Sequence, residues 1–229
     1  MFIPIHDETP LQVIRFQLVT LTIIVLNVGA FLITGAFTSD RALMAVAGGF
    51  GVVPAEFFGI VEPLIGYDPV SEPVTLITYQ FLHAGWLHLG SNMLFLWVFA
   101  DNVEDAFGHV AFIMFYLVCG VIGALAHIAV SPGSLSPLVG ASGAVSGVLG
   151  AYFLLYPKSR ILVIFNFFIP LRLGAMWILG GWFLLQVAAL FWNENSDVGV
   201  AFWAHIGGFV AGVVITWALR NRLLIRMAK

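Results

Sequence analysis

The sequence predicts an all-α membrane protein with six transmembrane helices. The chain has 229 residues, of which 61% are hydrophobic and only 9% are charged, whereas soluble proteins carry about 25% charged residues. A helix needs about 20 apolar residues to cross a bilayer whose core is roughly 30 Å thick. Five windows without Asp, Glu, Lys or Arg meet that length, namely 16–39, 73–100, 106–157, 173–193 and 198–219.

Four of these windows hold one span each, and the third holds two. The first span is expected at 16–37. We expect it to be a retained helix and not a secretory signal peptide, because the residues before it lack the basic start of such a signal. Window 106–157 is 52 residues long. It contains Ser131-Pro132-Gly133-Ser134 and Pro137, which interrupt helices and therefore divide it into two spans.

Two further segments are apolar but do not fit a span. The loop 38–72 is long and rich in glycine and proline, and its apolar residues predict short helices that dip into the outer leaflet of the membrane. Segment 161–171 is too short to cross and is flanked by Arg160 and Arg172, so we expect it to lie at the inner membrane surface.

The basic residues predict the orientation of the chain. Six spans place both termini on one side, and if that side is the cytoplasm, only Arg41 faces outward, as the positive-inside rule favours. We therefore expect a single integral membrane domain, 1–229, with cytoplasmic tails at 1–15 and 221–229, in a bacterial inner (plasma) membrane. The basic residues on the cytoplasmic side are then Arg15, Lys158, Arg160, Arg172, Arg220, Arg222, Arg226 and Lys229.

Composition and missing motifs exclude several function classes. The net charge of −3 and the absence of a basic patch argue against a nucleic-acid-binding protein. The sequence contains no His-Glu-x-x-His motif, which excludes the common zinc-protease site. It also contains no pair of aspartates inside the spans, so an intramembrane aspartyl protease is excluded.

Two runs of small residues predict close packing between the fourth and sixth spans. Small residues spaced four apart lie on one helix face and let two backbones approach. If these faces meet, Ser142 and His205 come within hydrogen-bonding distance, because both lie within about two turns of the outer ends of their helices. The small residues are Gly143, Gly147 and Ala151 in one span and Ala204, Gly208 and Gly212 in the other.

A serine beside a histidine is the minimum for nucleophilic acyl transfer, because the imidazole can remove the hydroxyl proton. No carboxylate is available nearby, so this would be a dyad. Ser142 begins a helix, where free backbone N–H groups can stabilise an oxyanion. His88 and Asn92 are four residues apart and share one face of the second span. Two single amides, Asn27 and Gln186, are interpreted as structural hydrogen-bonding groups between helices.

Three motifs resemble those of the rhomboid family of intramembrane serine proteases. Gly140-Ala141-Ser142-Gly143 resembles its GxSG motif, His88…Asn92 its HxxxN motif, and Ala204-His205…Gly208…Gly212 its AHxxGxxxG motif. The order of the motifs, their spacing and the six-helix core match as well.

The resemblance implies roles for individual residues. Ser142 would be the nucleophile and His205 the general base and acid, while His88 and Asn92 would donate to the oxyanion together with the Ser142 N–H. Glu104 and Gly108 resemble a structural turn of the family. The implied partners are membrane lipid and transmembrane protein substrates, cleaved within or beside their membrane segments, and no metal or cofactor is implied.

The sequence departs from the family pattern in places. Many members have an aromatic residue four positions after the nucleophile, where this chain has Ser146, and residues 38–72 lack the frequent Trp-Arg pair. The alternative function is a non-catalytic rhomboid-like protein that binds transmembrane clients, although such a relative is expected to lack the serine or the histidine. A solute transporter is disfavoured, because the two halves show no repeat and no intramembrane carboxylate or lysine offers a coupling-ion site.

Overall fold

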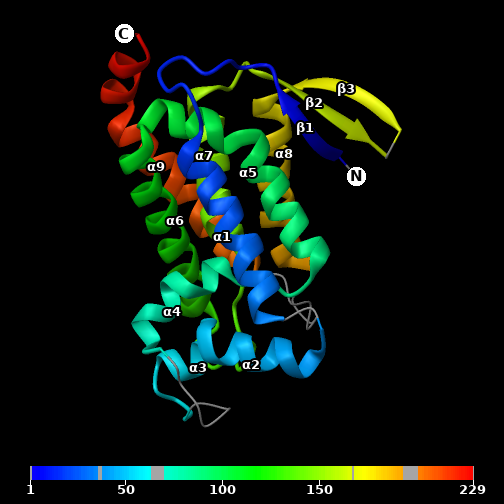
Figure 1. Ribbon diagram of the computed structural model, residues 1–229, viewed down its shortest axis with the longest axis vertical. Coiled ribbons are helices and arrows are strands. Elements are labelled where there is room, and N and C mark those ends of the chain that lie inside the picture. Colours follow the sequence, from blue (N-terminus) through cyan, green and yellow to red (C-terminus); the bar gives the residue numbers. More distant parts are fainter. Residues whose placement is uncertain (1, 36–37, 63–69, 167, 193–200, 229) are drawn as a thin grey trace.

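Long helices dominate the computed structural model, and one small sheet lies at the same end as both termini (Figure 1). The structure describes residues 2–35, 38–62, 70–166, 168–192 and 201–228. The helices that run along its long axis are α1 (Leu18–Thr34), α5 (Trp86–Phe107), α6 (His109–Val130), α7 (Ser142–Leu155), α8 (Ala175–Trp192) and α9 (Phe202–Met227). The break predicted within 106–157 is present, since α6 ends at Val130 and α7 begins at Ser142.

Three of the described helices, α6, α8 and α9, are long and apolar enough to cross a membrane. Helices α1 and α7 are apolar but shorter, at 17 and 14 residues. Helix α5 has 22 residues, but its last two turns carry Asp101, Glu104 and Asp105. The helices support a membrane protein, whereas the count of six spans is not confirmed and stays a prediction.

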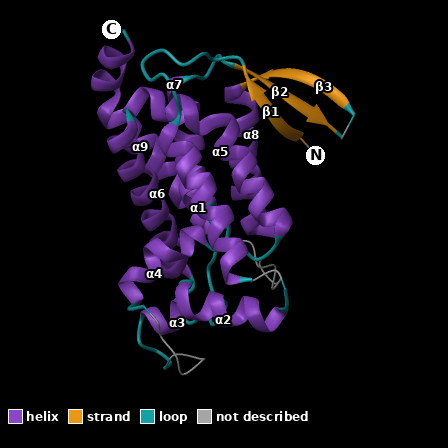
Figure 2. Ribbon diagram, in the orientation of Figure 1, coloured by secondary structure: helices purple, strands orange, loops and turns teal. Residues whose placement is uncertain are grey.

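A three-stranded antiparallel sheet makes the prediction of an all-α fold incomplete (Figure 2). Its strands are β1 (Phe2–Asp7), β2 (Arg160–Phe165) and β3 (Ile169–Gly174), in that spatial order. Ile161 and Val163 of β2 are fully buried, while Leu162 between them is partly exposed, which is the period-two alternation of a strand. The expected tail 1–15 and the expected surface segment 161–171 therefore pair with each other.

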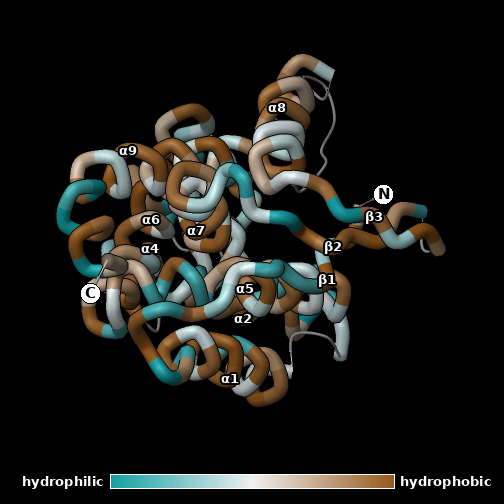
Figure 3. Tube along the Cα trace, turned by 90° about the horizontal axis from the view of Figure 1, so that it is seen from above, coloured by the Kyte–Doolittle hydropathy of each residue, from teal (hydrophilic) through white to brown (hydrophobic). Residues whose placement is uncertain are grey.

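Helix α7 lies between α1 and α8, which occupy opposite sides of the bundle (Figure 3). Every α7 residue from Gly143 to Tyr152 is buried. Its small face meets that of α9, as the sequence predicts, because a Cβ on Gly208 or Gly212 would overlap the carbonyl oxygen of Gly143 or Gly147, respectively. This close approach fixes α7 and α9 relative to each other.

Short helices close the end opposite the sheet (Figure 1), and the two that fall within 38–72 are those predicted for that loop. They are α2 (Asp40–Phe50), α3 (Pro54–Phe57), α4 (Glu72–Thr78) and the 3-10 helix η1 (Tyr79–Phe81). Tyr79 of η1 accepts a hydrogen bond from the Gly140 N–H at 2.9 Å and donates its hydroxyl to the Gly120 carbonyl at 2.6 Å. The loop that leads into α7 is thereby held against α6.

Two adjacent carboxylates hold the N-terminal segment at the sheet end. Glu104 accepts hydrogen bonds from the N–H groups of Val19 and Thr20, at 2.9 and 2.8 Å, in the first turn of α1. Asp105 accepts three from the backbone of residues 12–14, at 2.6 to 2.8 Å. A carboxylate suits the first turn of a helix, whose N–H groups have no partners within the helix.

Candidate active site

Ser142 stands at the first position of α7, directly after a sharp bend. Gly140 has a φ of 128°, which residues with a Cβ rarely adopt, and a Cβ there would lie 2.7 Å from the His88 imidazole. The first hydrogen bond of the helix runs from the Val145 N–H to the Ala141 carbonyl at 2.9 Å. The N–H groups of Ser142 and Gly143 therefore have no acceptor within α7.

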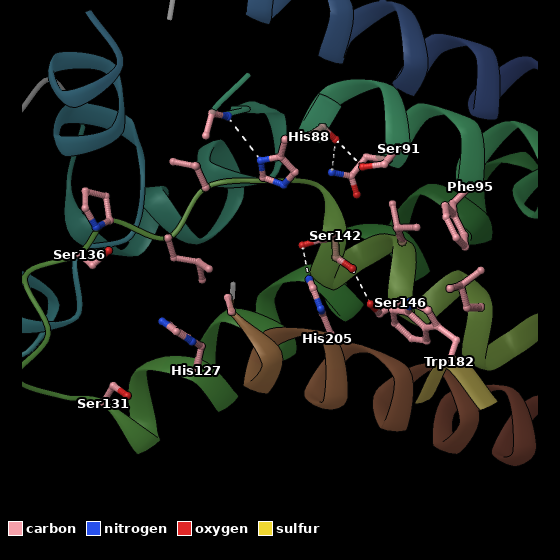
Figure 4. Close-up of a pocket in the computed structure, with 18 of the residues that line it drawn as sticks. His88, Ser91, Phe95, His127, Ser131, Ser136, Ser142, Ser146, Trp182 and His205 are labelled. Atoms are coloured by element: carbon pink, nitrogen blue, oxygen red, sulfur yellow. Dashed lines mark hydrogen bonds between the residues drawn. The ribbon is translucent and has the colours of Figure 1, made fainter. Parts of the chain in front are cut away.

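Ser142 and His205 are in direct contact (Figure 4), as the meeting of the small faces predicts. Nε2 of His205, from α9, lies 2.8 Å from Oγ of Ser142. On the other side of the ring, Nδ1 lies 2.8 Å from Oε1 of Gln186, from α8. Three helices thus meet at one imidazole.

His88 and Asn92 lie on the first two turns of α5 and line the same cavity as the dyad. The Asn92 side-chain amide donates one hydrogen bond to the His88 carbonyl at 3.0 Å. The Ala84 N–H donates to Nδ1 of His88 at 3.4 Å, which leaves Nε2 of that ring facing Gly140. The second Asn92 amide hydrogen and the His88 ring are the side-chain donors that this face of the cavity offers.

The cavity has a volume of about 900 Å³ and contains no Asp or Glu among the described residues that line it. His127, Ser131 and Ser136 lie on the side of the cavity away from Trp182 (Figure 4). Within the described part of the chain, no group of three or more His, Cys, Asp or Glu residues could hold a metal ion. The chemistry available here is that of hydroxyl, imidazole, amide and backbone N–H groups.

Two residues of α8 belong to this site, although nothing in the sequence marks either of them as functional. The sequence predicts a structural amide at Gln186, whereas in the structure this side chain contacts the imidazole of His205. Trp182 lies one turn earlier, and its ring centroid is 6.0 Å from that of His205 with an interplanar angle of 36°. The two residues are four apart and so share one face of α8, but the sequence alone does not show that this face turns inward.

Comparison with known proteins decides the family. A family model described as Rhomboid domain matches residues 70–222, about two thirds of the chain. The chain belongs to the rhomboid family. The matched region contains all three motifs and every residue described above for the site.

Curated rhomboid proteins from different organisms are similar to the chain. It is 33% identical over 166 residues to Rhomboid protein 1, mitochondrial, of Saccharomyces cerevisiae, covering 67% of this chain and 44% of that protein. It is 30% identical over 156 residues to RHOMBOID-like protein 6, mitochondrial, of Arabidopsis thaliana, covering 65% and 44%. It is 34% identical over 144 residues to Rhomboid protease GluP of Bacillus subtilis, covering 63% and 25%.

The matched part is less than half of each of these three relatives. One of them is named a protease, and the other two are named only as rhomboid or rhomboid-like proteins. Two are mitochondrial and one is bacterial, so the bacterial inner membrane stays a prediction for this rhomboid protein.

The departures from the rhomboid pattern have structural counterparts. Ser146 stands where many members have an aromatic residue, and it is buried with its hydroxyl donating to the Ser142 carbonyl at 2.6 Å. Trp182 of α8 is the aromatic residue beside His205 instead. At the structural turn, Nδ1 of His109 lies 2.5 Å from the Glu104 carboxylate.

Proposed function

We propose that this rhomboid protein is an intramembrane serine endopeptidase that uses Ser142 and His205 as a catalytic dyad. The observation that carries the proposal is the 2.8 Å contact between Ser142 Oγ and His205 Nε2. That contact lies at the wall of a cavity of about 900 Å³, which has room for a peptide segment and water.

The reaction follows from the chemistry of the two side chains. Nε2 of His205 takes the Ser142 proton as Oγ attacks the scissile carbonyl, and the tetrahedral adduct forms. The imidazolium then gives that proton to the leaving amine, and the C–N bond breaks to leave an acyl enzyme. Water, deprotonated by the same nitrogen, releases the acid product and restores the serine.

The oxyanion of the adduct needs donors that are already in place. The N–H of Ser142 has no acceptor within α7, because it belongs to the first turn. His88 and the free hydrogen of the Asn92 amide approach from α5, and both residues line the cavity. We assign these three groups to the oxyanion.

The substrates we propose are transmembrane proteins, cleaved within or beside their membrane segments. The apolar exterior of α8 supports this class, since Trp177, Leu184, Leu185 and Phe191 are all more than 60% exposed. In a membrane such a surface faces the lipid, which is where the transmembrane helices of other proteins also reside. No metal or cofactor enters the proposed reaction.

A fluorophosphonate probe tests the nucleophile without knowledge of the substrate. Purified wild-type protein in detergent should be labelled covalently, and Ser142→Ala and His205→Ala should not. Ser136→Ala is the matched control, because Ser136 also lines the cavity but lies away from the dyad. Equal labelling of wild type and Ser142→Ala would refute the assignment.

The alternative of a non-catalytic client-binding protein predicts a different result. Such a protein would retain transmembrane clients, and the Ser142→Ala variant would retain them equally well. Membrane proteomes of cells with wild-type and Ser142→Ala protein separate the two functions. A protease sheds fragments that the variant does not shed, and identical fragment patterns would favour the binding protein.

A further inference from the structure

The imidazole of His205 has two hydrogen-bonding partners, and the proposed reaction uses only one. Oε1 of Gln186 lies 2.8 Å from Nδ1. With the amide in this orientation its oxygen faces Nδ1, and because an amide oxygen only accepts hydrogen bonds, Nδ1 is the nitrogen that carries the hydrogen. Nε2 then presents its lone pair to Ser142 Oγ, which is the form a general base requires.

We propose that Gln186 is the positioning residue of the dyad and holds His205 in the Nδ1–H tautomer. This inference rests on the proposed function. In soluble serine proteases a buried carboxylate has this orienting role, and the wrong tautomer there lowers kcat about 10⁴-fold. Here the acceptor is a neutral amide, and no Asp or Glu is present among the described residues that line the cavity.

The position of Gln186 on α8 supports a role in orientation. Ala175 and Leu179 are the buried residues of α8, and Trp182 and Gln186 continue their stripe at spacings of three and four. That stripe faces the bundle, where an apolar residue is expected at every position. At 186 it carries an amide instead, one turn beyond Trp182, which lines the cavity, and in contact with His205.

Trp182 completes the environment of the imidazole. Its ring lies 6.0 Å from that of His205, one turn before Gln186 on the same helix. The orientation of His205 is therefore set from α8, whereas the register of His205 against Ser142 is set by the packing of α7 on α9.

Nuclear magnetic resonance of the histidine nitrogens tests the tautomer independently of catalysis. In protein labelled with ¹⁵N-histidine, the His205 signals are assigned as those missing from His205→Ala. Wild type should show a protonated Nδ1 and an unprotonated Nε2, whereas Gln186→Leu should show a mixture of tautomers. Gln186→Glu keeps an acceptor oxygen in place and should restore the wild-type pattern.

The rate of fluorophosphonate inactivation supplies the second measurement. Gln186→Leu should lower the limiting inactivation rate about 10- to 100-fold, in analogy with the loss on removing a residue that orients a metal-bound histidine, with little change in probe affinity. Gln186→Glu should recover most of the rate. Asn27→Leu is the control, because Asn27 is also an amide in an apolar helix but donates to its own helix, at Ile23.

The outcomes separate this inference from the function on which it rests. Failure of the wild-type protein to react with the probe would overturn the proposed function, and the assignment of Gln186 with it. A reactive wild type with an unchanged rate and tautomer in Gln186→Leu would overturn the assignment of Gln186 alone. An equal rate loss in Asn27→Leu would do the same, since the effect would then belong to helix packing.

Discussion

Two groups of polar side chains lie in this protein, and they differ in how completely the chain satisfies them. At the sheet end, Glu104 and Asp105 are fully buried and accept backbone and side-chain hydrogen bonds on all four carboxylate oxygens. At the cavity, Ser142 and His205 are only half-buried. Their neighbours His88 and Asn92 face the same open space.

The difference distinguishes polar groups that stabilise the fold from polar groups that remain available for a reaction. A buried carboxylate whose acceptors are all used stabilises the fold, and removing it leaves donors without partners. Polar groups beside a cavity retain hydrogen-bonding capacity for a ligand or a transition state. We therefore expect changes at the sheet end to alter stability with little effect on chemistry, and changes at the dyad to do the reverse.

The largest expected effect is the loss of catalysis in Ser142→Ala. If the dyad works like the Ser–His pair of soluble proteases, turnover should fall about 10⁶-fold. The apparent Tm in detergent should stay within about 1 °C of wild type, because the cavity can admit water to bond His205. A marked fall in Tm would contradict the comparison, since it would mean that the dyad contact holds the fold.

The next effect is on the oxyanion donors. Asn92→Ala should slow turnover about 100-fold, or about 3 kcal/mol, the cost of one such donor. Rates on a fixed transmembrane substrate, with KM determined separately, measure it. Ser91→Ala is the control, because Ser91 precedes Asn92 and its hydroxyl donates to the same His88 carbonyl. An equal loss in both variants would point to a disturbed helix end.

At the sheet end the expected loss is in stability. Glu104→Gln replaces one acceptor oxygen by an NH₂ group that faces the donors of α1, which should cost about 2 kcal/mol and lower the apparent Tm by about 4–8 °C. Labelling by the fluorophosphonate below the transition should be unchanged. Glu8→Gln is the control, because Glu8 pairs with Arg172 at the surface, where both side chains are more than 40% exposed and the pair contributes little.

The sequence was informative where residue spacing alone fixes a contact. Glycines four apart in two apolar helices leave one way for the helices to pack, and that packing places Ser142 against His205. The motif that contains His88 and Asn92 likewise fixes their common helix face. The charge-free windows and Pro132 and Pro137 marked where the third and fourth long helices separate.

The sequence was less informative where a contact depends on distant partners. Residues 161–165 are uniformly apolar, so their period of two is hidden, and their strand partner β1 lies about 155 residues away. Helix α8 is apolar on every side, so nothing in the chain indicates which face turns inward, and Gln186 was interpreted as a structural amide. Both features follow from tertiary packing, which local patterns do not encode.

The smallest expected effect concerns Asp7, another buried carboxyl at the sheet end. Burial is the main influence and raises the pKa of Asp7 above its ordinary value of 3.8, despite a 2.7 Å hydrogen bond from the Tyr152 hydroxyl. The folded protein therefore holds this proton more tightly than the unfolded chain. Its stabilising contribution is present below about pH 4 and is lost as the pH rises through the raised pKa.

Asp7→Asn should remove the loss of stability that occurs as Asp7 ionises with rising pH. Asparagine stays neutral, and its amide oxygen can still accept the hydrogen bond from Tyr152. We expect the variant to be as stable as wild type near pH 4 and more stable, by about 1 kcal/mol or less, at pH 7. Apparent Tm values of both proteins from pH 4 to 8 measure the difference. A variant less stable than wild type at pH 7 would mean that the charged carboxylate is the stabilising form, in which case Asp7 belongs with Glu104 and Asp105 as a satisfied structural group.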